Sequence, residues 1–123
     1  MSLFDTAGFD AFALGLPGGA LVDQWEARVA KVGGKVFALL ASGGTGLGAG
    51  GPRIVFKCGE DSFEILTAID GVAQAPYFAK RQWVSVAHSD DLPQRDLEAY
   101  IRRSHDLVAR GLTKKVRQEL GIG

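Results

Sequence analysis

The fold is decided between residues 28 and 40, where the chain reads Arg28-Val29-Ala30-Lys31-Val32-Gly33-Gly34-Lys35-Val36-Phe37-Ala38-Leu39-Leu40. Two strand-like runs are separated by two glycines, and glycine readily adopts the positive φ angles that tight hairpin turns require. The pattern therefore predicts a β-hairpin. The second run, Val36 to Leu40, contains no polar residue, so this strand is expected to be covered on both faces.

Further elements are expected on both sides of the hairpin, from helical spacing of apolar residues or from short apolar and alternating runs. The expected helices cover residues 4–14, 60–69, 93–110 and a segment from Thr113 to Leu120, and the expected strands cover 21–25, 28–32, 35–40, 53–57 and 83–87. This order predicts one α/β (α+β) domain over residues 1–123, with a mostly antiparallel sheet and helices over one of its faces.

Composition excludes several classes of protein. The 123 residues include 14 basic and 14 acidic side chains, so the totals do not describe a strongly basic nucleic-acid protein. Cys58 is the single cysteine, which excludes an intramolecular disulfide and a multi-cysteine metal site. The longest apolar run, Val36 to Ala41, is far shorter than the roughly 20 residues of a membrane span. With no export signal near Met1, a reducing cytoplasm is the expected location.

The motifs that suggest catalysis lack the structural context that catalysis needs. Residues 46–51 match G-x-G-x-x-G, but Pro52 and a strand follow where a dinucleotide site needs a helix, so we interpret the segment as a flexible loop. Ser104, His105 and Asp106 are neighbours on one helix and point about 100° apart, which prevents a catalytic relay. His88 and His105 are too few for a typical zinc site. We therefore expect no enzyme activity, no metal and no cofactor.

Strand alternation and charge provide a hypothesis about binding. From Lys80 to the end the chain has nine basic and six acidic residues, a net charge of about +3. In the strand over 53–57, alternation places Val55 with Arg53 and Lys57 on one side. Trp83 is expected on the same side, which predicts an open sheet face with an aromatic ring among cations. The alternative is that Trp83 belongs to the core, with Lys80 stretched across it.

Four strings occur in order and at familiar spacing: Val32-Gly33-Gly34-Lys35-Val36-Phe37-Ala38, Phe56-Lys57-Cys58, Ala79-Lys80-Arg81-Gln82-Trp83 and Ser104-His105-Asp106-Leu107-Val108. Together they resemble the MmcQ/YjbR family of small bacterial proteins. The resemblance implies a compact α/β domain, similar to secretion-chaperone-like folds and described as a double-wing DNA-binding motif. Ala79, Gln82 and Val84 replace the asparagine, histidine and second asparagine usual in that family around Lys80 and Trp83, and this removes polar groups there.

We therefore expect a non-catalytic binding domain whose partner is DNA or another nucleic acid, bound weakly. The side chains expected to make the contacts are basic or aromatic: Lys57, Lys80, Arg81, Trp83, Arg103, Lys114, Lys115 and Arg117. The alternative is a protein-interaction or self-association module that uses the open face of the sheet. No membrane partner is expected.

Overall fold

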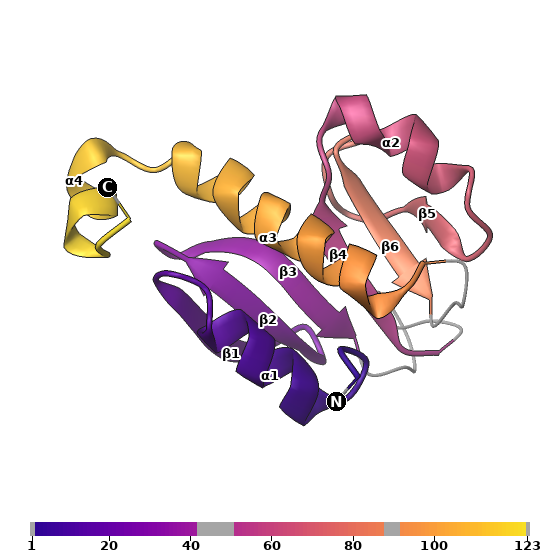
Figure 1. Cartoon of the computed structure of the whole chain (residues 1–123), viewed down its shortest axis with the longest axis horizontal. Coiled ribbons are helices and arrows are strands. Elements are labelled where there is room, and N and C mark those ends of the chain that lie inside the picture. The colour runs from indigo at the N-terminus through magenta and orange to yellow at the C-terminus, as the bar shows by residue number, and fades with distance from the viewer. Residues whose placement is uncertain (1, 42–50, 88–91, 123) are drawn as a thin grey trace.

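The computed structural model describes residues 2–41, 51–87 and 92–122 (Figure 1). The elements in chain order are α1 (Thr6–Leu14), β1 (Gly19–Gln24), β2 (Ala27–Val32), β3 (Lys35–Ala41), β4 (Arg53–Lys57), α2 (Glu60–Thr67), β5 (Val72–Gln74), β6 (Trp83–Ala87), α3 (Gln94–Arg110) and α4 (Lys114–Glu119). In the described part of the chain, none of the helices has the length and apolar character needed to cross a membrane.

The strands form one six-stranded sheet in the order β1-β2-β3-β4-β6-β5, and each adjacent pair is antiparallel. The predicted hairpin joins β2 to β3, with Gly33 at φ 58° and Gly34 at φ 79° in the turn. Both angles lie in the region that glycine tolerates best. The antiparallel sheet, the hairpin and the helices on one face are thus confirmed, whereas the short edge strand β5 was not expected.

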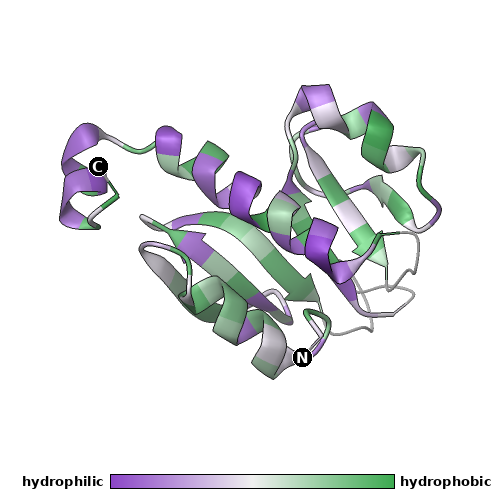
Figure 2. Cartoon of the chain, viewed as in Figure 1, coloured by the Kyte–Doolittle hydropathy of each residue, from purple (hydrophilic) through white to green (hydrophobic). Residues whose placement is uncertain are grey.

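Helices α1, α2 and α3 all pack on one side of the sheet, which we call the helical face (Figure 1). In Figure 2, α3 carries bands of purple and green, as an amphipathic helix should. Phe9 of α1, Leu66 of α2 and Ile101 of α3 are buried in one cluster with Ile54 and Phe56 of β4. The alternation predicted for β4 is therefore confirmed.

The other side of the sheet, which we call the opposite face, has a smaller buried cluster. Val29, Leu39 and Val55 are fully buried there, and Phe78 and Trp83 pack against them. The expectation of an open face is wrong at its centre, because the segment between β5 and β6 supplies apolar side chains that pack on these strands. The expectation that β3 is covered on both faces is confirmed, because residues 37–41 are all buried.

Ser104 of α3 forms hydrogen bonds to the sheet at a β-bulge in β3. Ala30 pairs with Ala38 and Lys31 pairs with Val36, so Phe37 is an extra residue in β3. Such a bulge removes one residue from the regular ladder. The Oγ of Ser104 donates to the carbonyl of Phe37 at 2.5 Å and accepts from the backbone N–H of Lys57 at 2.9 Å. The position of Ser104 on the apolar side of α3 is thus structural.

His105 also has a structural role. It is buried, its Nε2 lies 2.6 Å from the carbonyl oxygen of Pro17, and its ring meets the edge of Phe37 with centroids 5.1 Å apart. Asp106 instead pairs with Arg110 at 2.5 Å on the exposed side of α3. The three neighbours therefore serve three separate contacts, as expected. His88 and residues 46–50, most of the segment interpreted as a loop, lie outside the described residues.

Candidate nucleic-acid interface

The charged side chains of the strands differ between the two faces. On the helical face, Asp23 and Arg28 lie together, and Arg28 donates to Asp10 of α1 at 2.9 Å. On the opposite face, alternation places Lys31, Arg53 and Lys57, all of which are cations. Among the described strand residues, no acid lies on that face. Opposite charges thus pair on one side of the sheet, whereas positive charge accumulates on the other.

Trp83 lies on the opposite face beside these cations. It is directly across from Lys57 in the pairing of β6 with β4. Its ring is partly buried, because it packs on the second cluster and against Phe78, with ring centroids 4.6 Å apart at 33°. The two interpretations offered for Trp83 therefore each hold in part, since the indole contributes to packing and still reaches solvent.

Lys80 and Arg81, from the segment before β6, have different surroundings. Lys80 is exposed. The guanidinium of Arg81 donates to Glu64 of α2 at 2.9 Å and lies 5.5 Å above the ring centroid of Phe63. Arg81 is therefore held at α2 and does not extend over the opposite face.

Arg103 is also engaged with α2. It donates to Asp61 at 2.6 Å and to the Oγ of Ser62 at 3.3 Å. The hydrogen bond from Arg103 is the main reason why the pKa of Asp61 is lowered from its usual value. This cation belongs to the helical layer, remote from Trp83 in the arrangement of the layers.

Lys114, Lys115 and Arg117 lie on α4, at the far end of α3 from α2 and β6 (Figure 1). Since α3 has 17 residues, it is about 25 Å long. The structure therefore does not bring the predicted residues onto one surface. Lys57 and Trp83 lie side by side with Lys80 in the adjoining segment, whereas the α4 cations are remote.

Sequence reasoning missed Lys31 and Phe78. The run Val29-Ala30-Lys31-Val32 shows no clear alternation of apolar and polar residues, because β2 is covered on both faces, with Val29 in one cluster and Ala30 and Val32 in the other. Phe78 lies outside the regular elements, so periodicity provides no information about its direction. The sequence feature that could have indicated where Phe78 packs is the nearby aromatic residue Trp83, which its ring contacts.

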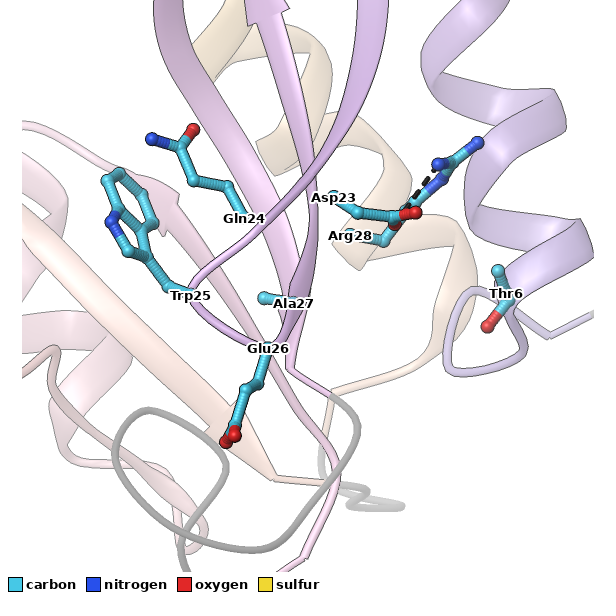
Figure 3. Close-up of a pocket in the computed structure, with 7 residues that line it drawn as sticks. All are labelled: Thr6, Asp23, Gln24, Trp25, Glu26, Ala27 and Arg28. Atoms are coloured by element: carbon cyan, nitrogen blue, oxygen red, sulfur yellow. Dashed lines mark hydrogen bonds and ion pairs between the residues drawn. The ribbon is translucent and has the colours of Figure 1, made fainter.

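Two hollows in the described part of the chain contain no arrangement typical of an active site. One, of about 410 Å³, lies between α2 and α3 and is lined by Leu66, Ile69, Leu92, Asp96, Ala99, Tyr100 and Arg103. The other, of about 360 Å³, surrounds the turn between β1 and β2 and is lined by Thr6 and residues 23–28. Figure 3 shows Trp25 and Gln24 on one side of this turn, with the ion pair of Asp23 and Arg28 on the other.

Cys58 is not an activated nucleophile. It is buried, and this burial raises the pKa of the thiol, which favours the unreactive protonated form. Among the described residues, no three His, Cys, Asp or Glu side chains are grouped so that they would hold a metal ion.

Comparison with known proteins identifies the family. The family model described as YjbR matches residues 14–107, which is most of the chain. The chain belongs to the YjbR family. Among solved structures, the Deinococcus radiodurans protein DR2400, with its DUF419 domain, is 25% identical with a TM-score of 0.78, covering 95% of this chain and 88% of its own. A Pseudomonas syringae protein is 20% identical with a TM-score of 0.68, covering 84% of this chain and 97% of its own.

A search of curated proteins gives no match. YjbR is an uncharacterised domain family and not a known enzyme family. The α+β fold expected from the resemblance is confirmed by these two solved structures, whose descriptions name no ligand.

Proposed function

We propose that this YjbR domain binds nucleic acid weakly and without catalysis, through the opposite face of the sheet. The proposal is carried by one observation: Lys31, Arg53 and Lys57 are the charged strand residues on that face, and Trp83 lies among them. Cations attract phosphates, and an aromatic ring provides a surface on which bases stack.

The distribution of charge between helices and strands supports this choice of surface. The helices carry eight acids and seven cations, whereas the strands carry one acid and five cations. A formal charge of zero for the whole chain therefore conceals a positive sheet. Local fields of this kind attract an anionic polymer even when the totals balance.

The expected affinity is low because few cations are available. Lys31, Lys57 and Lys80 allow about three phosphate contacts, which predicts a slope of about −2 for log K against log salt with single strands. Single strands are the favoured form, because base stacking on Trp83 needs an unpaired base. Fluorescence anisotropy with labelled single-stranded and duplex DNA across a salt series measures both quantities.

A charge-matched pair of variants locates the binding surface. Lys57→Glu removes a proposed contact and should reduce the salt slope by about 1. Arg95→Glu makes the same change in net charge on an exposed residue of the first turn of α3, where an acid is favourable, and should leave binding unchanged. Equal losses in both variants, or no salt dependence in the wild type, would refute the proposal.

The alternative occupant of this face is a protein partner. Trp83→Ala combined with Lys80→Ala, checked for folding by circular dichroism, separates the two possibilities. Loss of DNA binding in the folded double variant supports nucleic acid. Retained DNA binding contradicts our proposal and leaves the aromatic–cationic surface to a protein.

A further inference from the structure

The two edges of the sheet differ in how they are protected. In the described part of the chain, β1 pairs with β2 alone and β5 pairs with β6 alone. β5 has only three residues, and a very short edge strand is a common protection against pairing. β1 has six residues and no lysine or proline, and its Val22 is 39% exposed. The outer edge of β1 thus lacks these protections, and its main chain is available to pair with another strand.

Helix α1 packs on β1 and β2 at this edge of the sheet (Figure 1), and some of its apolar residues are exposed. Apart from Thr6 and Asp10 its residues are all nonpolar, and Figure 2 shows it mostly in the green of hydrophobic residues. A helix that is apolar on all sides is normally buried on all sides. The exposed residues Ala7, Ala11 and Leu14 share one side of α1, and Leu14 is 57% exposed.

This exposed side is turned away from α3. Phe12 marks the direction of α3, because the guanidinium of Arg102 lies 5.0 Å from its ring centroid. Leu14 follows Phe12 by two residues and so lies about 200° around the helix. The apolar side of α1 is consequently oriented away from the neighbouring helix, where the molecule's own elements do not cover it.

The two ends of β1 carry opposite charge. One end is the turn to β2, where Thr6 and Glu26 border the same hollow (Figure 3). The charged residues near this end are Asp5, Asp10, Asp23, Glu26 and Arg28. The other end is covered by the residues that follow α4, since Leu120 and Ile122 lie close to Gly18. The charged residues of the elements at that end are Lys31, which pairs with Ala20, then Lys35, and on α4 Lys114, Lys115, Arg117 and Glu119.

We propose that a second copy of this chain binds at this edge, with β1 of each copy antiparallel to β1 of the other and with the two α1 helices in contact. The arrangement has twofold symmetry, so the same patch is used by both copies. An antiparallel pairing places the acidic end of each β1 next to the basic end of its partner. This charge complementarity favours a second copy over an unrelated strand.

The side-chain pattern is compatible with such pairing. Directly opposed residues of an antiparallel pair share a face, so Val22 can face its own counterpart. In that register Asp23 lies across from Leu21, and the two like charges do not meet. The small side chains of Ala7 and Ala11 allow the two α1 helices to approach closely while Leu14 is buried.

The test is the oligomeric state of the full chain by sedimentation equilibrium over a range of concentrations. The wild type should form a dimer that weakens as salt rises. Val22→Lys places two like charges at the symmetry axis and should raise the dimer Kd about tenfold or more. Ile65→Lys introduces the same charge at an exposed apolar residue of α2, near the other edge of the sheet, and is the control that should leave the dimer unchanged.

A charge exchange keeps the proposal testable if Val22→Lys fails to fold. Glu26→Lys and Lys115→Glu should each weaken the dimer, and their combination in one chain should restore it, because complementarity between the ends returns. A monomeric wild type, or a dimer insensitive to all three substitutions, would overturn the proposal. DNA binding is measured separately, so failure of one proposal leaves the other intact.

Discussion

The two faces of the sheet are covered by different amounts and kinds of structure. On the helical face, large side chains such as Phe37 and Phe56 pack against three helices and are fully buried. On the opposite face, smaller residues such as Val29 and Val55 are buried by contacts that include a single segment bearing Phe78. Cations surround this second cluster. The difference indicates that stability is concentrated on the helical face, while the opposite face retains the charge and partial exposure that binding requires.

Two neighbouring residues of β4 test this division most directly. Phe56 and Val55 are both fully buried and face opposite sides of the sheet. Phe56→Ala should cost about 3–5 kcal/mol of unfolding free energy, because it leaves a large cavity between sheet and helices. Val55→Ala should cost about 2 kcal/mol, because fewer buried groups are removed. Urea denaturation of both variants gives the two values.

The m-value serves as the control, since it should remain that of the wild type if both variants retain the native structure. Equal losses from the two substitutions would show that both faces contribute alike, and the proposed division of stability would then be wrong.

Two buried serines, one on each face of the sheet, allow a second comparison of the faces, with an expected loss of stability smaller than that of Phe56→Ala. Ser104→Ala removes the hydroxyl that satisfies the carbonyl of Phe37 and the N–H of Lys57, and should cost about 2–3 kcal/mol. Ser85 on the opposite face is equally buried, but its Oγ has no hydrogen-bond partner among the described residues. Ser85→Ala should therefore be neutral or stabilising.

Thermal denaturation of the two serine variants side by side measures this contrast. If Ser85→Ala is as destabilising as Ser104→Ala, the contacts of Ser104 are not what joins α3 to the sheet. Because both substitutions remove the same atom from a buried site, the change in apolar volume does not explain a difference between them.

Much of the fold was predictable because its signals are local. The glycines at 33 and 34 predict the hairpin, and alternation in residues 53–57 predicts which side of β4 faces the helices. β5 was missed because three residues, Val72 to Gln74, are too few to show a period of two. Its pairing with β6 is a tertiary contact that carries no local signal.

The candidate site was predictable only in part, because long-range contacts decide which cations remain available. Arg81 and Arg103 were expected at the interface, but each pairs with an acid of α2, at Glu64 and Asp61, which are 17 and 42 residues away. Sequence spacing reveals pairs three or four residues apart on one helix and not pairs of this kind. The same limit applies to Trp83, whose partial burial depends on contacts outside its own strand.

The smallest predicted effect on stability concerns the ion pair of Asp61 and Arg103. It tests a polar contact between α2 and α3. Arg103 lowers the pKa of Asp61 in the folded protein, mainly through its hydrogen bond. The stabilisation is therefore fully present above the unfolded pKa of Asp and is lost as pH falls through the lowered folded value. Since both side chains are well exposed to solvent, the effect should be small and reduced by salt.

Asp61→Asn should lower the melting temperature slightly at neutral pH, and the difference from the wild type should vanish in strong acid, where the wild-type carboxyl is also protonated. Arg103→Gln should reproduce the neutral-pH loss, and the double variant should lose no more than either single variant, because one interaction is removed in all three. A difference that persists at low pH would mean that Asp61 contributes through something other than its negative charge, and its pair with Arg103 would then not be the cause.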